Sequence, residues 1–136
     1  MLNDAELRSL LESSRTIAIV GAKDTPGHPV DRVGRYLIAA GYEVMPVHPA
    51  RKKVWNLDCF ARLADIPVPI DIIDVFRAPQ FCPGHAAEAV SLATPPRLFW
   101  MQLGIRSEES VAVLEDRKIP VVEDACLMVE HIRLFG

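Results

Sequence analysis

Thr16-Ile17-Ala18-Ile19-Val20-Gly21 is the segment that decides the fold, a short β-branched run that ends at a glycine. Continuous apolarity over this length is typical of a strand buried on both faces, as in a parallel sheet. The loop 22–28 follows, and Pro29 stands where the first turn of a helix tolerates proline. Apolar residues then recur at helical spacing from Val30 to Ala40, and Gly41 ends the helix. The segment therefore predicts the beginning of a βαβ unit.

The same alternation of apolar segments and helical patterns extends along the chain. Further strands are expected at 42–48, near 54–55, and at 70–76, 97–103 and 120–123. Further helices are expected at 3–13, 77–93, 107–118 and after Asp124, with Asn3, Ser107 and Asp124 as N-caps. This order predicts an α/β fold, a three-layer Rossmann-like parallel sheet of about five to six strands with helices on both faces. We expect one domain over residues 1–136.

Composition excludes several classes of protein. Half of the 136 residues are hydrophobic, 24% are charged and the formal net charge is −3, which argues against a nucleic-acid binder. The first residues do not resemble a signal peptide, and the sequence lacks an apolar stretch long enough to span a membrane. Cys59, Cys82 and Cys126 are widely spaced, so neither a disulfide framework nor a metal site is expected. These features favour a cytoplasmic protein without a membrane partner.

Polar and conformationally special residues follow the apolar strands. In an open parallel sheet, ligands collect at the carboxyl ends of the strands, near the point where the strand order reverses. The predicted strands lead there to Gly21, to His48 and Pro49, to Phe76 and Arg77, to Gln102 and Gly104, and to Asp124 and Cys126. We therefore expect a ligand site at this edge.

The first turn is the most informative part of this edge. A glycine at the end of the strand lets a phosphate approach the backbone amides, and the following helix directs its positive dipole end to the same place. Lys23 and Arg32 add positive charge, although the loop lacks the G-x-G-x-x-G pattern of dinucleotide-binding folds. His48 and Pro49 stand where NAD-binding folds carry an acid, and the basic run 51–53 follows. A cofactor with a phosphorylated ribose, such as coenzyme A or NADP, fits this pattern better than NAD.

The chain resembles the small CoA-binding-domain proteins, stand-alone Rossmann relatives of the CoA-binding half of succinyl-CoA synthetase. The matching segments are IAIVGAK, HPVDRVGRYLIAAGYEVMPVHP, ADIPVPIDIIDVFRAPQ, FWMQLGI and EDACLMVEH. The resemblance implies that Gly21, Ala22, Lys23 and Arg32 contact phosphates, that His48-Pro49 and Phe76-Arg77 flank the nucleotide, and that Gln102 and Gly104 line the pantetheine side. The family commonly has asparagine in place of His48, and Asp-Arg-Cys-x-Lys in place of the segment 124–128. The candidate cofactor-binding residues are Gly21, Ala22, Lys23, Pro29, Val30, Arg32, His48, Pro49, Phe76, Arg77, Gln102, Gly104 and Cys126.

Several of these residues also have structural interpretations. Lys23 and Arg32 are equally compatible with solvent-exposed positions, and Arg77 with an ion pair to Asp71 or Asp74. We expect Cys126 two residues into the last helix, where the helix dipole favours a thiolate that could exchange with a CoA thiol or disulfide. The alternative is that Cys126 is a small buried apolar residue.

Three functions remain open from the sequence. The first is a binding module for CoA or an acyl-CoA without catalysis of its own, because no set of nucleophile, base and orienting residue can be assembled. The second is a small thiol-redox or acyl-transfer enzyme that uses Cys126 with CoA. The third is an NAD(P)-sensing regulatory domain. The expected partner is a small-molecule CoA ligand, with a homodimer possible, and no catalytic or metal-binding residue is assigned.

Overall fold

The computed structural model describes residues 2–136 and contains a five-stranded parallel sheet in the order β2-β1-β5-β6-β7. The strands are β1 (Thr16–Val20), β2 (Glu43–Val47), β5 (Ile72–Val75), β6 (Leu98–Met101) and β7 (Val121–Val122). The chain moves from β1 to β2 in one direction and then returns to place β5 on the other side of β1. The strand order therefore reverses between β1 and β5, as in Rossmann-like folds, and the predicted fold class is confirmed.

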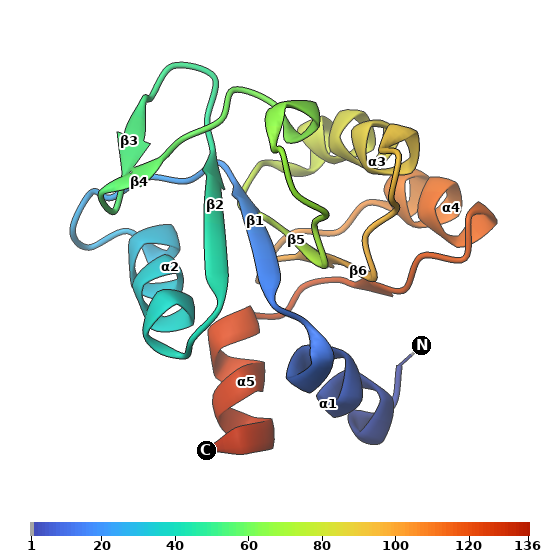
Figure 1. The fold of residues 1–136 in the computed structure, drawn as a ribbon. Helices are drawn as coiled ribbons and strands as arrows, with labels where there is room; N and C mark the ends of the chain where they lie inside the picture. The colour runs from blue at the N-terminus through green and yellow to red at the C-terminus, as the bar shows by residue number, and fades with distance from the viewer. Residues whose placement is uncertain (1) are drawn as a thin grey trace.

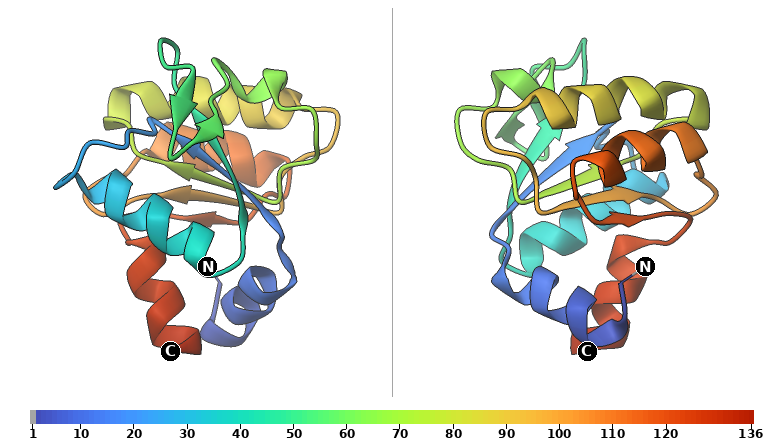
Figure 2. Two further views of the ribbon diagram at one scale, coloured as in Figure 1. Left: turned by 60° about the vertical axis from the view of Figure 1, so that its left-hand side comes forward. Right: turned by 90° about the vertical axis from the view of Figure 1, so that its right-hand side faces the viewer.

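Helices cover both faces of the sheet (Figures 1 and 2). The helices α1 (Asp4–Ser13), α2 (Pro29–Ala39) and α5 (Leu127–Phe135) lie on one face, and α3 (Cys82–Ser91) and α4 (Glu108–Asp116) lie on the other. Ile17 and Ile19 pack toward the first group, whereas Ala18 and Val20 pack toward the second. All five residues of β1 are buried, which explains its continuous apolar sequence.

The strand expected near 54–55 does not join the parallel sheet. Instead, β3 (Lys53–Val54) pairs with β4 (Leu57–Asp58) in an antiparallel hairpin. Its turn residues Trp55 and Asn56 both adopt positive φ, which suits a tight two-residue turn between antiparallel strands. The Trp55 indole donates a hydrogen bond to Asp31 at 2.9 Å, and a Cβ on Gly34 would lie 2.2 Å from its ring. The hairpin is therefore anchored on α2 by one tryptophan that packs against a glycine.

Two of the three predicted N-caps are confirmed. Asn3 forms a capping box with Glu6, and the Ser107 side chain accepts a hydrogen bond from the Ser110 N–H. The helix expected at 77–93 begins later, as the short 3-10 helix η2 (Pro79–Phe81) followed by α3. Another 3-10 helix, η1 (Leu63–Asp65), lies in the segment before β5.

The prediction that Asp124 caps the last helix is wrong. The N-cap position of α5 is Cys126, so this residue precedes the helix instead of lying two residues inside it. Asp124 has a positive φ of 52°, and its carboxylate accepts hydrogen bonds from the Gly104 N–H at 2.6 Å and from Arg106 at 3.1 Å. The Asp124 carboxylate therefore ties the loop before α5 to the loop after β6, and these bonds lower its pKa.

Asp74 lies in the middle of β5 and is completely buried. Neither carboxylate oxygen has a hydrogen-bond partner among residues 2–136, and burial raises the pKa of this carboxyl well above its ordinary value. The expected alternative of an ion pair between Arg77 and Asp71 or Asp74 is not formed, because the Asp71 carboxylate accepts the N–H groups of Arg15 and Thr16. Burial inside an apolar layer thus favours the protonated form of Asp74.

We predict that the free energy of unfolding of Asp74→Asn increases relative to that of the wild type as the pH rises above about 4. The folded protein keeps the Asp74 proton, whereas the unfolded chain releases it near the ordinary aspartate pKa of about 3.9. The free energy of unfolding of the wild type should therefore fall by about 1.4 kcal/mol per pH unit relative to the variant, until the folded-state pKa is reached. Urea denaturation of both proteins between pH 4 and 7 measures this difference.

Asp116→Asn is the matched control, because Asp116 is exposed in the last turn of α4. Its stability difference from the wild type should stay nearly constant over the same range. A similarly constant difference for Asp74→Asn would contradict a protonated Asp74.

Candidate functional site

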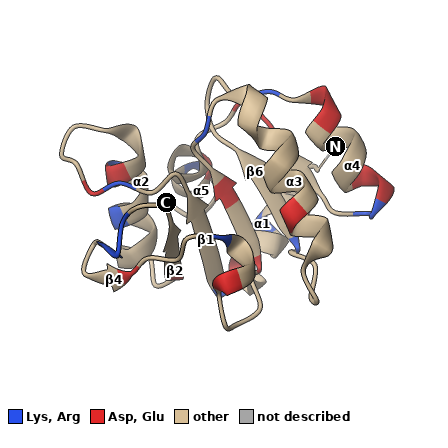
Figure 3. Cartoon of the chain, turned by 90° about the horizontal axis from the view of Figure 1, so that it is seen from above, with Lys and Arg blue, Asp and Glu red and all other residues tan. Residues whose placement is uncertain are grey.

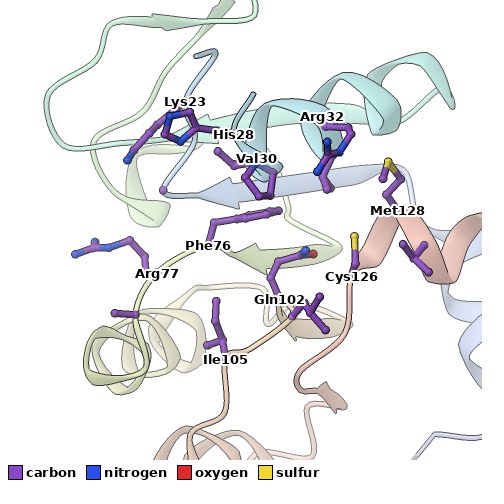
Figure 4. A pocket seen from close by; sticks show the side chains of 16 residues that line it. Lys23, His28, Val30, Arg32, Phe76, Arg77, Gln102, Ile105, Cys126 and Met128 are labelled. Carbon is purple, nitrogen blue, oxygen red and sulfur yellow. The ribbon is translucent and has the colours of Figure 1, made fainter. Parts of the chain in front are cut away.

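A cavity of about 580 Å³ opens at the carboxyl ends of β1, β5 and β6, beside the first turns of α2 and α5 (Figure 4). Its size lies within the range of small-molecule sites, roughly 300–1,000 Å³. Nine of the thirteen candidate residues line it, namely Gly21, Lys23, Pro29, Val30, Arg32, Phe76, Arg77, Gln102 and Cys126. The structure therefore brings together most of the residues that the strand-end argument selected.

Gly21 allows the end of β1 to approach the end of β5. Its φ is +84°, and a Cβ there would lie 2.5 Å from the Phe76 carbonyl oxygen and 3.2 Å from Arg77 Cδ. Any larger residue would push the two strand ends apart. The first turn consequently lies directly beside Phe76 and Arg77, which line the same cavity.

The first turn differs from the prediction that its backbone amides are open to a phosphate. The N–H groups of Gly21 and Ala22 both donate to the Val47 carbonyl, at 3.0 and 3.2 Å. Ala22 is fully buried and does not line the cavity. Since these two donors already bond to β2, an anion in the cavity would depend on groups beyond them, beginning with the Lys23 side chain.

Cationic side chains gather near one end of the cavity. Lys23 and Arg77 line this end, and His48 lies close enough that burial, Arg51, Lys23 and Arg77 together lower its pKa. The Arg77 guanidinium stacks over the Phe81 ring at 4.2 Å, and its Nη1 lies 3.4 Å from His85 Nε2. Arg77 is therefore held by an aromatic ring and an imidazole, with no carboxylate partner among the described residues.

Three other predicted residues lie at the margin of this site. His48 is absent from the lining, and its Nδ1 accepts a hydrogen bond from the Ala50 N–H. Pro49 lines a smaller neighbouring cavity, and Gly104 bonds to Asp124. Of the basic run 51–53, Arg51 pairs with Asp24 at 3.1 Å and Lys53 pairs with Asp58 at 2.7 Å. Figure 3 shows Lys and Arg positions in the region of α2 and β4.

The opposite end of the cavity is held by side chains of β6 and its extension. The Trp100 indole donates to the Ala125 carbonyl at 2.8 Å, and the Leu127 N–H donates to Gln102 Oε1 at 3.1 Å. These bonds fasten the residues on both sides of Cys126. In Figure 4 the Gln102 amide points toward Cys126, and Arg32 projects from α2 near Met128.

Sequence reasoning missed part of the lining. Leu103, Ile105 and Val129 add apolar surface, and Leu103 is 70% exposed. Leu103 and Ile105 flank the predicted Gly104 and could have been found from it. The remaining residues missed are His28, Val33, Ala78 and Met128.

The chemistry of the lining is that of an anion site with an apolar extension. Within the described residues it contains the cations Lys23, Arg32 and Arg77 and no aspartate or glutamate. No cluster of three potential metal ligands occurs among residues 2–136. A search of the same residues also finds no helix that is long and apolar enough to cross a membrane.

The chain is similar to several known proteins. A family model described as a CoA binding domain matches residues 15–132. The uncharacterized protein YneT of Bacillus subtilis is 35% identical over 127 residues, which is 93% of each chain. Among solved structures, the Thermus thermophilus protein called cell-free ID.343 is 44% identical with a TM-score of 0.93, over 98% of this chain and 100% of that one. A hypothetical protein from Pyrococcus horikoshii is 30% identical with a TM-score of 0.94, over 99% and 94%.

We predict that Gly21→Ala lowers the free energy of unfolding more than Gly27→Ala does. Both glycines have positive φ, 84° and 90°, so each alanine carries a backbone cost of about 1 kcal/mol. Only the Gly21 substitution also forces a Cβ against a backbone carbonyl, which adds about 1–3 kcal/mol. Urea denaturation measures both variants, and equal losses of stability would contradict the close approach of β1 to β5.

Proposed function

We propose that this chain, which belongs to the CoA binding domain family, binds coenzyme A or an acyl-CoA in the cavity at the carboxyl edge of its sheet. We further propose that it acts as a binding module without catalysis of its own. The observation that supports this most directly is the lining itself, which has three cations and no carboxylate in a chain of net charge −3. Such a local excess of positive charge favours a polyanionic ligand.

The phosphates are assigned to the end formed by Lys23 and Arg77. A guanidinium presents paired donors that match phosphate oxygens, and an ammonium adds a mobile point charge. Arg77 needs no rearrangement of an ion pair before it binds a phosphate, because its neighbours are Phe81 and His85. The first turn of α2, with Pro29 and Val30 in the lining, directs its positive dipole end toward the same space.

The pantetheine arm is assigned to the end near Gln102. This arm combines amide groups with short apolar segments, so it needs both hydrogen-bonding groups and apolar walls. Gln102 supplies an amide, and Leu103, Ile105 and Val129 supply apolar surface. A ligand with phosphates at one end and amide and apolar groups at the other therefore matches Lys23 and Arg77 at one end and Gln102 with its apolar neighbours at the other.

A nicotinamide dinucleotide fits less well. NAD-binding folds place an acid at the end of the second strand, where it accepts hydrogen bonds from the ribose hydroxyls. Here β2 is followed by His48 and Pro49, and no carboxylate lines the cavity among residues 2–136. A phosphorylated ribose does not need this carboxylate, so the cavity suits the phosphorylated ribose of CoA better than the ribose diol of NAD.

We predict that isothermal titration detects CoA binding and that Lys23→Ala and Arg77→Ala each weaken it by about 10- to 100-fold. Each variant removes a charged hydrogen bond to phosphate, a contribution of about 1.5–3 kcal/mol. Arg117→Ala is the control, because Arg117 is exposed at the end of α4 and outside the cavity. Equal affinities of all three variants, or no heat with any CoA species, would overturn the proposal.

Two further ligands test the nucleotide end. Dephospho-CoA should bind more weakly than CoA if the ribose phosphate contacts the cationic end, and the difference should shrink as salt is raised. NADP should bind more weakly than CoA, because its second nucleoside does not match the apolar end. NADP binding that is tighter than CoA binding would support an NAD(P)-sensing domain instead.

A further inference from the structure

Cys126 lies in the cavity, at the end away from Lys23 and Arg77 (Figure 4). Its position is fixed from both sides, because Trp100 Nε1 bonds to the Ala125 carbonyl and Gln102 Oε1 accepts the Leu127 N–H. The thiol is free and partly exposed, and its Sγ has no hydrogen-bond partner among the described residues. Cys126 therefore packs against the edge of the core and also lines the cavity.

Gln102 is a second and independent feature at this end. The side chain is buried, with only 4% exposed, and its amide points toward Cys126 in Figure 4. The Oε1 atom is used by Leu127, but no hydrogen bond from Nε2 to residues 2–136 is present. The Nε2 atom is not among the buried side-chain atoms that lack a partner, so it is accessible from the cavity and can donate a hydrogen bond to a ligand. The end beside Cys126 is therefore built to receive a polar group of a bound molecule.

The surroundings of Cys126 also carry positive charge. Cys126 is the N-cap residue of α5, a nine-residue helix whose first turn has no side-chain cap. Helix N–H groups and the helix dipole attract an anionic group of a ligand to this position. Arg32 projects into the same end of the cavity from α2, and it adds a positive charge.

The other two cysteines have different surroundings. Cys82 is fully buried, its Sγ lies 3.8 and 3.9 Å from the Ala78 and Arg77 carbonyls, and burial raises the pKa of its thiol. Cys59 contacts the His48 carbonyl at 4.0 Å, and burial likewise raises its pKa. Neither residue lines the main cavity. The chain thus contains internal controls for the reactivity of Cys126.

We infer that Cys126 is a thiol–disulfide exchange site for the thiol end of a CoA molecule bound in this cavity, an inference that rests on the proposed function. The co-reactant is a CoA disulfide. The Cys126 thiolate attacks the sulfur of the bound CoA half, a new disulfide forms between Cys126 and that half, and the original S–S bond breaks. The other half leaves as a thiolate with the bonding electron pair and takes a proton from water. One disulfide replaces another, so no external oxidant is consumed.

The test treats the full reduced chain with CoA disulfide and follows the intact mass, with peptide mapping to locate the adduct. We expect one CoA moiety on Cys126, removed by dithiothreitol. Cys59→Ser should react like the wild type, and Cys126→Ser should give no adduct. An adduct on Cys59 instead of Cys126, or no adduct, would overturn the inference.

A comparison of rates separates a built site from general thiol reactivity. Binding in the cavity raises the local concentration of the disulfide beside Cys126, so CoA disulfide should react at least about tenfold faster than oxidised glutathione. Excess reduced CoA should slow the reaction by competition. Equal rates with the two disulfides would also overturn the inference.

Titration of reduced CoA into Cys126→Ser distinguishes this inference from the proposed function. If this variant binds CoA but the wild type forms no adduct, the binding function stands and thiol exchange is rejected. If neither protein binds CoA nor reacts with its disulfide, both proposals are overturned.

Discussion

The close packing of β1 against β5 at Gly21 is the constraint on which the site depends. The Gly21 backbone lies so near the Phe76 carbonyl that even a methyl group would be 2.5 Å from its oxygen. Because the strand order reverses between these two strands, their ends diverge into different helices and leave a cavity between them. The same approach brings Lys23 and Arg77, which are far apart in the sequence, to one end of that cavity.

The sixth strand provides the second fixed edge of the site. Trp100 and its strand neighbour Gln102 bond to the segment that precedes α5, while Asp124 bonds back to Gly104. These contacts come from side chains, whereas the sheet itself is held by backbone hydrogen bonds. Cys126 is consequently presented to the cavity by a rigid support, which is the arrangement that a defined exchange site requires.

Charge is distributed around this site in a way that composition does not reveal. The chain is acidic overall, and several of its cations are paired, such as Arg51 with Asp24 and Lys53 with Asp58. The cations in the cavity face no carboxylate within the lining, so they remain available to a ligand. The acidic residue of β5 is Asp74, and burial raises its pKa, which favours its uncharged form.

The sequence by itself determined the α/β class, the parallel strands and the edge of the sheet at which the cavity opens, since buried strands and strand ends follow from local patterns. It also predicted nine of the residues that line this cavity. Only the tertiary structure decided which polar groups were already satisfied. The Val47 carbonyl accepts hydrogen bonds from the Gly21 and Ala22 N–H groups, and the Asp124 carboxylate accepts one from the Gly104 N–H. Trp55 holds its hairpin against α2, so the hairpin does not extend the sheet. These partners are far apart in the sequence, so no local sequence pattern predicts them. Hydrogen bonds between distant segments form only when the packed sheet brings their donors and acceptors together.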